Sequence, residues 1–244
     1  MDFLASPEFW LALGQIIIID ILLGGDNAVV IALACRKLPP AQRTKGIIWG
    51  TAGAIILRVI LIAFAMTLLA LPFLKFVGAV LLVWIGVKLL APDEDGHGDV
   101  QGSDKLLAAI MTIIVADLVM SVDNVIAIAG AAQNAGEHQF LLVVLGLLIS
   151  IPIIVWGSQL VIKLMERFPF IITLGGMLLG WIAGGMLVTD PVFSNPDKWQ
   201  WMFKIPQTDM IRYGASVAGA LLVLALGKMI LARRAATAAP VEHG

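Results

Sequence analysis

Long apolar stretches alternate with short polar segments along the 244 residues of the chain. A helix needs about 20 mostly apolar residues to cross the hydrocarbon core of a bilayer. Seven stretches approach or exceed that length, and each predicts one transmembrane helix: about 9–34, 44–69, 72–91, 105–131, 140–163, 169–188 and 211–232. Pro152 lies inside the fifth stretch, where its missing backbone N–H predicts a kink.

The overall composition agrees with a chain embedded in lipid. Hydrophobic residues make up 60% of it, charged residues only 14%, and the mean hydropathy is +0.97. Soluble domains are about half apolar and about a quarter charged. The net charge of −1 offers no basic field for nucleic acid, and the single cysteine, Cys35, excludes an intramolecular disulfide. We therefore expect an all-α polytopic membrane protein whose surroundings are the lipid bilayer, with no nucleic-acid partner.

The placement of lysine and arginine predicts the orientation, because these residues are enriched in cytoplasmic loops. With the N-terminus outside, eleven of the 16 basic residues fall at inner helix ends and loops, and four fall outside. The inner residues are Arg36, Lys37, Arg43, Lys45, Lys88, Lys105, Lys163, Arg167, Lys228, Arg233 and Arg234. The outer residues are Lys75, Lys198, Lys204 and Arg212. We expect the N-terminus out and the C-terminus in, in a multi-pass protein of the bacterial inner (plasma) membrane.

The sequence matches itself after a shift of 97 residues, which places the motif that begins at Asp20 on the one that begins at Asp117. The match returns between 71–90 and 168–187, where Pro, Phe, Gly and Trp recur in one register. We interpret the two halves as duplicate copies. Because each copy has three helices, the second enters the bilayer inverted. Inverted repeats recur in secondary transporters, with the binding site near the midplane between them.

These copies predict a single transmembrane domain that extends over residues 1–244. The first repeat covers about 9–91, and the second covers about 105–188. An acidic cytoplasmic loop at 92–104 joins them. An extracytoplasmic segment at 189–210 then leads to a seventh helix at 211–232, which has no counterpart.

Each copy opens with two aspartates and an asparagine inside an otherwise apolar helix. A carboxylate near the bilayer centre costs roughly 2.5–3.5 kcal/mol on insertion scales, whereas hydrogen bonds between membrane helices average about 0.6 kcal/mol. Helix pairing alone therefore does not account for four such acids, and we interpret them as functional. The residues are Asp20, Asp26, Asn27, Asp117, Asp123 and Asn124.

Helical spacing places these side chains relative to one another. Asp20 and Asn27 are seven residues apart and share a helix face with Gly24 between them, while Ser121 holds the equivalent position in the second copy. The Gly24–Gly25 pair favours a local helix break and close helix packing equally.

Because the copies are antiparallel, Asp20 and Asp117 should form a middle pair near the bilayer centre. Asp26 should lie inward of that pair and Asp123 outward of it. Carboxylate and amide oxygens, without thiolate or imidazole, suit a hard divalent cation such as manganese, calcium or magnesium.

Arg58 lies in the middle of the second predicted helix, and its counterpart in the fifth is apolar. A central position disfavours an arginine whose charge reaches the membrane interface. We interpret Arg58 as a counter-ion to the acids, with gating of the ion path as the alternative. The sequence has no nucleotide-binding loop and no HExxH or GxSxG motif, so we expect neither an enzyme nor a fixed cofactor.

The doubled motif, DILLGGDNAVVIA at 20–32 and DLVMSVDNVIAIA at 117–129, resembles the TerC family of integral membrane proteins, in its YjbE-like branch. The resemblance covers about 9–232 and implies kinship with the lysine-exporter superfamily and export of metal ions, manganese above all. By position, the family's metal site falls on the same six polar residues. Many members have Glu where this chain has Asp20 and Asp117, which implies a slightly wider site.

Three functions remain open at this point. The leading hypothesis is a secondary transporter that exports divalent metal, with exchange for protons as a means of driving it. A membrane scaffold or assembly factor would tolerate Asp→Asn changes that preserve hydrogen bonding. An exporter of an amino-acid-like solute would need mixed charges and a larger cavity. The sequence does not fix the metal, the driving ion, or whether the protein forms a homodimer.

Overall fold

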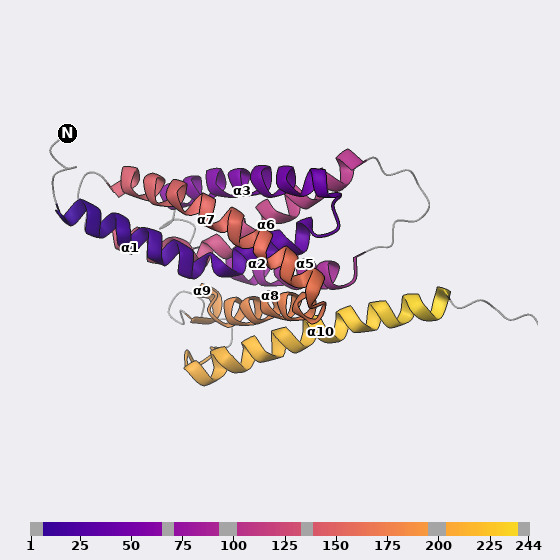
Figure 1. Ribbon diagram of the computed structural model, residues 1–244. Coiled ribbons are helices and arrows are strands. Elements are labelled where there is room, and N and C mark those ends of the chain that lie inside the picture. The colour runs from indigo at the N-terminus through magenta and orange to yellow at the C-terminus, as the bar shows by residue number, and fades with distance from the viewer. Residues whose placement is uncertain (1–6, 65–70, 93–101, 133–138, 195–203, 239–244) are drawn as a thin grey trace, which may run out of the picture.

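The computed structural model describes residues 7–64, 71–92, 102–132, 139–194 and 204–238, without the side chains of 123–132 and of a few residues at helix ends. Every regular element within these ranges is a helix (Figure 1). In chain order they are α1 (Pro7–Leu23), α2 (Gly25–Cys35), α3 (Pro40–Ala63), α5 (Leu74–Leu90), α6 (Gly102–Ala132), α7 (Gln139–Arg167), α8 (Phe170–Val188), α9 (Pro191–Ser194) and α10 (Asp209–Ala238).

The described helices include five that are long and apolar enough to cross a membrane: α3, α6, α7, α8 and α10. A sixth crossing results if α1 and α2, which are bent by 46° relative to each other, form one span. The remaining long element, α5, has 17 residues and is therefore about 26 Å long. The chain is thus an all-helical membrane protein with five or six spans among the described residues, fewer than the seven that apolar length alone predicts.

The first apolar stretch is broken at Gly24, which separates α1 from α2. A Cβ atom at Gly24 would overlap the carbonyl oxygen of Asp20, so only glycine fits this backbone path without a shift. The equivalent residues of the second copy, Ser121 and Val122, lie inside the continuous helix α6. The break is therefore confined to the first half. Helix α7, by contrast, runs through Pro152 as a single helix.

Helices from the two halves of the chain pack crosswise. Helix α3 packs along α6, whereas α7 packs along α1 and α2, and α5 lies against α8. Fully buried side chains such as Ile16, Leu82, Ile113 and Leu179 fill the space between these helices. In Figure 1, α1 begins at one end of the bundle, and α10 ends at the opposite end.

Large apolar side chains also cover the outside of the bundle. Leu22, Trp49 and Trp156 lie on three different helices and are 76%, 65% and 67% exposed. Contiguous apolar surface on this scale is rare in soluble monomers. An apolar outer surface is suited to contact with the hydrocarbon of a bilayer, so it supports the same membrane location as the long apolar helices.

Asp190 ties the two halves together at the end of the bundle where α8 finishes. This buried carboxylate accepts hydrogen bonds from the backbone N–H groups of Phe73 and Phe76, each at 3.1 Å, and of Val192 at 2.9 Å. It therefore caps both α5 and α9, and it supports Phe73 in a left-handed conformation with φ of 62°. The sequence predicts only an outer segment at 189–210 and does not single out Asp190. An aspartate followed by a proline, as in Asp190–Pro191, is nevertheless typical of a helix start. Residues 195–203 of that segment lie outside the description.

Helix α10 lies along α8, and the two backbones approach closely at glycines (Figure 1). A Cβ at Gly180 would overlap the carbonyl oxygen of Gly219, and one at Gly184 would overlap that of Ala215. Small residues allow this close approach in membranes, where van der Waals contact replaces the hydrophobic driving force. The glycines of α8 are therefore packing residues.

We expect Gly184→Ala to lower the thermal stability of the purified protein, because the new methyl group meets backbone atoms that cannot move aside. Overpacking of this kind costs about 1–3 kcal/mol, or about 5 °C in melting temperature for a chain of this size. Gly214→Ala is the matched control, since a Cβ at Gly214 has nothing within 4 Å. Melting curves of both variants in detergent test the prediction, and equal stabilities would contradict it.

Candidate functional site

Three buried charges from three helices meet inside the bundle. Arg58 of α3 forms ion pairs with Asp20 of α1, at 2.5 Å from Nη1 to Oδ1, and with Asp117 of α6 through Nη2. The side chains of Arg58, Asp20 and Asp117 are 3%, 2% and 8% exposed. We call this group, Asp20, Arg58 and Asp117, the central triad. With both acids ionised it carries a net charge of −1.

Ser121 completes the hydrogen bonding on one side of the triad. Arg58 donates from Nε to the Ser121 hydroxyl at 3.0 Å, and that hydroxyl donates to Oδ2 of Asp117 at 3.0 Å. Ser121 lies one helical turn after Asp117, which is why both face the same guanidinium. The planar guanidinium presents several fixed donors, so one arginine can hold acceptors from two helices at once.

Several polar atoms beside the triad have no hydrogen-bond partner among the described residues. They are Oδ2 of Asp20, Oγ1 of Thr51, and both Oδ1 and Nδ2 of Asn27. The Ser150 hydroxyl, which donates to the carbonyl of Gly146 at 3.0 Å, lies beside Asp20 and can turn toward it. A buried amide without partners is costly, so the open positions at Asn27 indicate a place for a ligand or water.

Asn27 and Thr51, two of the residues with open positions, line a small cavity with a volume of about 20 Å³. Its polar lining consists of Asn27, Thr51, Arg58 and Asp117, and the rest of its wall is apolar. A space of this size holds about one water molecule. The cavity therefore fits a water or a bare ion, in contact with a carboxylate, an amide and a hydroxyl.

The structure brings some of the predicted site residues together and leaves one aside. Asp20 and Asp117, the expected middle pair, meet on one guanidinium. Asn27 lies at the neighbouring cavity. Asp26 is half-buried and accepts a hydrogen bond from the backbone N–H of Asn27 at 2.8 Å, outside the triad but within electrostatic range of Arg58.

The remaining predicted residues, Asp123 and Asn124, lie on α6, but their side chains are outside the described residues. Within the described part of the chain, no three His, Cys, Asp or Glu side chains gather as metal ligands would. A cation at the triad would thus have two carboxylates, together with neutral oxygens, and would share them with Arg58.

Thr51 and Ser150 were missed by the sequence analysis. Thr51 precedes Arg58 by seven residues and so lies on the same face of α3, which is a signal that the sequence does contain. Ser150 lies on α7 without such a relation to any charged residue of its own helix. Its position beside Asp20 depends on the packing of α7 along α1.

Comparison with known proteins gives the family. The profile of the integral membrane protein TerC family matches residues 5–235. The membrane protein YjbE of Bacillus subtilis strain 168 is 44% identical over 187 residues, which cover 77% of this chain and 84% of YjbE. The UPF0053 inner membrane protein YgdQ of Escherichia coli K12 is 27% identical over 185 residues, 68% of this chain and 75% of YgdQ.

Neither relative's name states what it transports or binds, and no solved structure matches the chain significantly. The family match extends over both Asp–Asn motifs and every described helix that contributes to the central triad. The resemblance inferred from the doubled motif is thereby confirmed, and the chain belongs to the integral membrane protein TerC family.

Proposed function

We propose that this protein is a secondary transporter that exports divalent metal cations, with manganese as the favoured substrate. The observation that carries the proposal is the meeting of two buried carboxylates, one from each half of the chain, beside a cavity with unpaired neutral oxygens. Intramembrane acids are expensive and are usually retained for transport or proton transfer.

In this proposal Arg58 occupies the place of the cation in the resting state. The triad has a net charge of −1, and a divalent ion added to it would raise the charge to +1. Loading therefore requires Arg58 to withdraw from Asp20 and Asp117, or further acids to approach. Asp26 lies within electrostatic range of Arg58 and is one acid that can receive it. Asp123 is the second candidate by its position in the repeat.

The donor atoms favour a hard cation. Asp20, Asp117, Asn27 and Thr51 offer only oxygen, which suits manganese, magnesium or calcium more than copper or zinc. Calcium prefers six to eight oxygens, and magnesium gives up its water reluctantly. The choice of manganese among them follows the family resemblance.

The architecture proposed here is two inverted three-helix repeats and a seventh helix, with the N-terminus outside. Three observations support it. Helices from the first half of the chain pack against helices from the second half, and the first apolar stretch is broken into α1 and α2. In addition, α1 begins at one end of the bundle and α10 ends at the opposite end. Broken helices and repeat interfaces are recurrent features of transporter binding sites. The description of YgdQ as an inner membrane protein supports placement in the bacterial plasma membrane.

An exporter of an amino-acid-like solute is the second candidate, because Arg58 gives the site the mixed charges that such a solute needs. The volume of the cavity argues against it. About 20 Å³ accommodates a single ion or water, whereas an amino acid would need the helices to separate. Flux assays that include lysine alongside the metals distinguish the two functions.

We expect Asp117→Asn to abolish manganese efflux while leaving the protein folded, because the amide keeps the shape of the ligand and removes its charge. Asp104→Asn, an exposed position on the same helix, is the matched control and should transport normally. Manganese flux in proteoliposomes, measured with a metal-quenched dye, tests both. Normal flux in Asp117→Asn would favour a scaffold function.

We expect Arg58→Gln to make the protein's stability depend on manganese. Removing one partner of a buried ion pair costs about 3–5 kcal/mol, on the order of 10 °C in melting temperature. A divalent cation that replaces the guanidinium should restore most of this loss, because a ligand that binds only the folded state stabilises it. The triple variant Asp20→Asn/Arg58→Gln/Asp117→Asn lacks the uncompensated charges and should show no such response. Melting curves with and without manganese decide the matter; equal responses of both variants would refute a cation site at the triad.

We expect manganese binding to release at most about one proton per ion. Arg58 offsets one of the two negative charges of Asp20 and Asp117, so the empty site lacks one positive charge, which a single proton shared with the neighbouring Asp26 can supply. Proton release is measured with a pH indicator in weakly buffered detergent solution, and Asp26→Asn should reduce it. Release of two or more protons would mean that Arg58 does not offset a negative charge of the pair in the empty site.

A further inference from the structure

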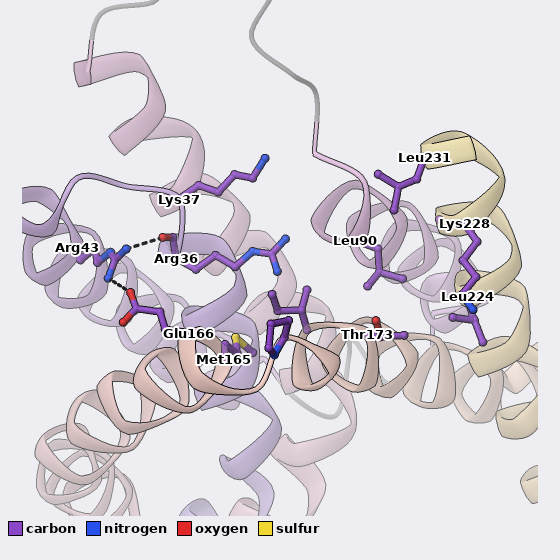
Figure 2. Close-up of a pocket in the computed structure, with 13 residues that line it drawn as sticks. Arg36, Lys37, Arg43, Leu90, Met165, Glu166, Thr173, Leu224, Lys228 and Leu231 are labelled. Atoms are coloured by element: carbon purple, nitrogen blue, oxygen red, sulfur yellow. Dashed lines mark hydrogen bonds and ion pairs between the residues drawn. The ribbon is translucent and has the colours of Figure 1, made fainter. Parts of the chain in front are cut away.

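A second pocket lies at the end of the bundle where α2, α5 and α7 finish and where α3 and α8 begin (Figure 2). It has a volume of about 500 Å³. Its charged lining consists of four basic residues, Arg36, Lys37, Arg43 and Lys228, and one acid, Glu166. The lining thus carries a net charge of +3, at the end that the distribution of basic residues assigns to the cytoplasm.

Arg43 and Glu166 form the fixed wall of this pocket. Their side chains are joined at 2.5 Å, and Arg43 also donates to the carbonyl oxygens of Leu38, at 3.0 Å, and Arg36, at 2.9 Å. Figure 2 shows the contacts of Arg43 with Glu166 and with Arg36 on the side of the pocket away from α10. Because Glu166 is held by Arg43, it does not neutralise the other basic residues.

Arg36 is held at one nitrogen and open at another. Its Nη2 donates to the carbonyl oxygen of Leu89 at 2.8 Å, whereas the buried Nη1 has no hydrogen-bond partner among the described residues. In Figure 2 the guanidinium extends into the gap, and Lys228 lies on α10 across from it. Burial lowers the pKa of Arg36, yet arginine remains charged in proteins, so this donor calls for an acceptor.

The chemistry of the pocket selects the kind of ligand. The positive charges of Arg36 and Lys228 repel a metal cation, which makes this pocket unsuitable as its entrance. An anion fits the charge, but a small soluble anion would leave the apolar side chains Leu90, Leu224 and Leu231 unmatched. A ligand with an anionic head and a hydrocarbon chain matches both parts. Basic pockets between membrane helices on the cytoplasmic side are typical sites for anionic lipid headgroups.

We propose that this pocket binds one anionic phospholipid. The phosphate lies between Arg36 and Lys228, with Lys37 at the mouth, and an acyl chain follows the apolar wall formed by Leu90, Leu224 and Leu231. Such a lipid joins α10 to the ends of α2 and α5. The proposal is independent of the transport function, since none of these residues belongs to the central triad.

The test uses the full chain in detergent, titrated with dioleoylphosphatidylglycerol, with dioleoylphosphatidylcholine and with inorganic phosphate, and monitored by native mass spectrometry. Lys228→Gln and Arg36→Gln should each weaken phosphatidylglycerol binding about fivefold, and the double variant about 30-fold. Lys163→Gln is the matched control: Lys163 is exposed near the same end of α7 but does not line the pocket. Its affinity should equal that of the wild type.

Three outcomes would overturn the proposal. Equal binding of phosphatidylcholine would show that charge does not select the lipid. Inorganic phosphate that displaces the lipid, or stabilises the protein equally, would indicate a site for a soluble anion. An equal loss in Lys163→Gln would indicate a diffuse surface charge effect. Because Lys228 is exposed and lacks the structural hydrogen bond of Arg36, its variant keeps the test valid if Arg36→Gln fails to fold.

Discussion

Arg58 lies between Asp20 and Asp117 in the buried interior of the bundle, so each of these side chains depends on the other two. Hydrocarbon offers no hydrogen bonds, and an unpaired charge there costs far more than a loss of packing. The guanidinium therefore fixes the relative heights of α1, α3 and α6, because any sliding of one helix would separate a pair. The depth of the two acids and the position of the cavity follow from this single constraint.

Under the proposed transport function, a substrate ion must overcome the same interaction. Breaking a buried ion pair is costly, and a substrate ion competes for the same oxygens. The break at Gly24 lies four residues after Asp20, in the first half of the chain, where one apolar stretch forms two separate helices, α1 and α2. Helices α8 and α10, in contrast, are locked by backbone contact at glycines. The closely packed pair, α8 and α10, is thus formed by helices other than α1, α3 and α6, which carry the triad.

Charge is also distributed unequally between the two ends of the bundle. Asp190 uses its carboxylate to cap two helices at one end, and Arg36 and Arg43 bind helix-end carbonyls at the other. Each follows the helix dipole, which favours acids at N-termini and bases at C-termini. The lining of the pocket at the second end has four basic residues, Arg36, Lys37, Arg43 and Lys228, and one acid, Glu166.

The sequence by itself determined the parts of the structure that depend on local composition. Apolar length fixed which segments are membrane helices, since a helix must satisfy its backbone within itself in lipid, although α5 proved shorter and α1–α2 broken. The internal repeat predicted that Asp20 and Asp117 form a middle pair, and in the structure both acids bind Arg58. Only the tertiary structure decided that Arg58 binds both acids, that Thr51 and Ser150 lie beside them, and that basic residues far apart in the chain share one pocket. These contacts join helices from different parts of the chain, and their geometry depends on helix rotation and close approach, which hydrophobic patterning leaves unspecified.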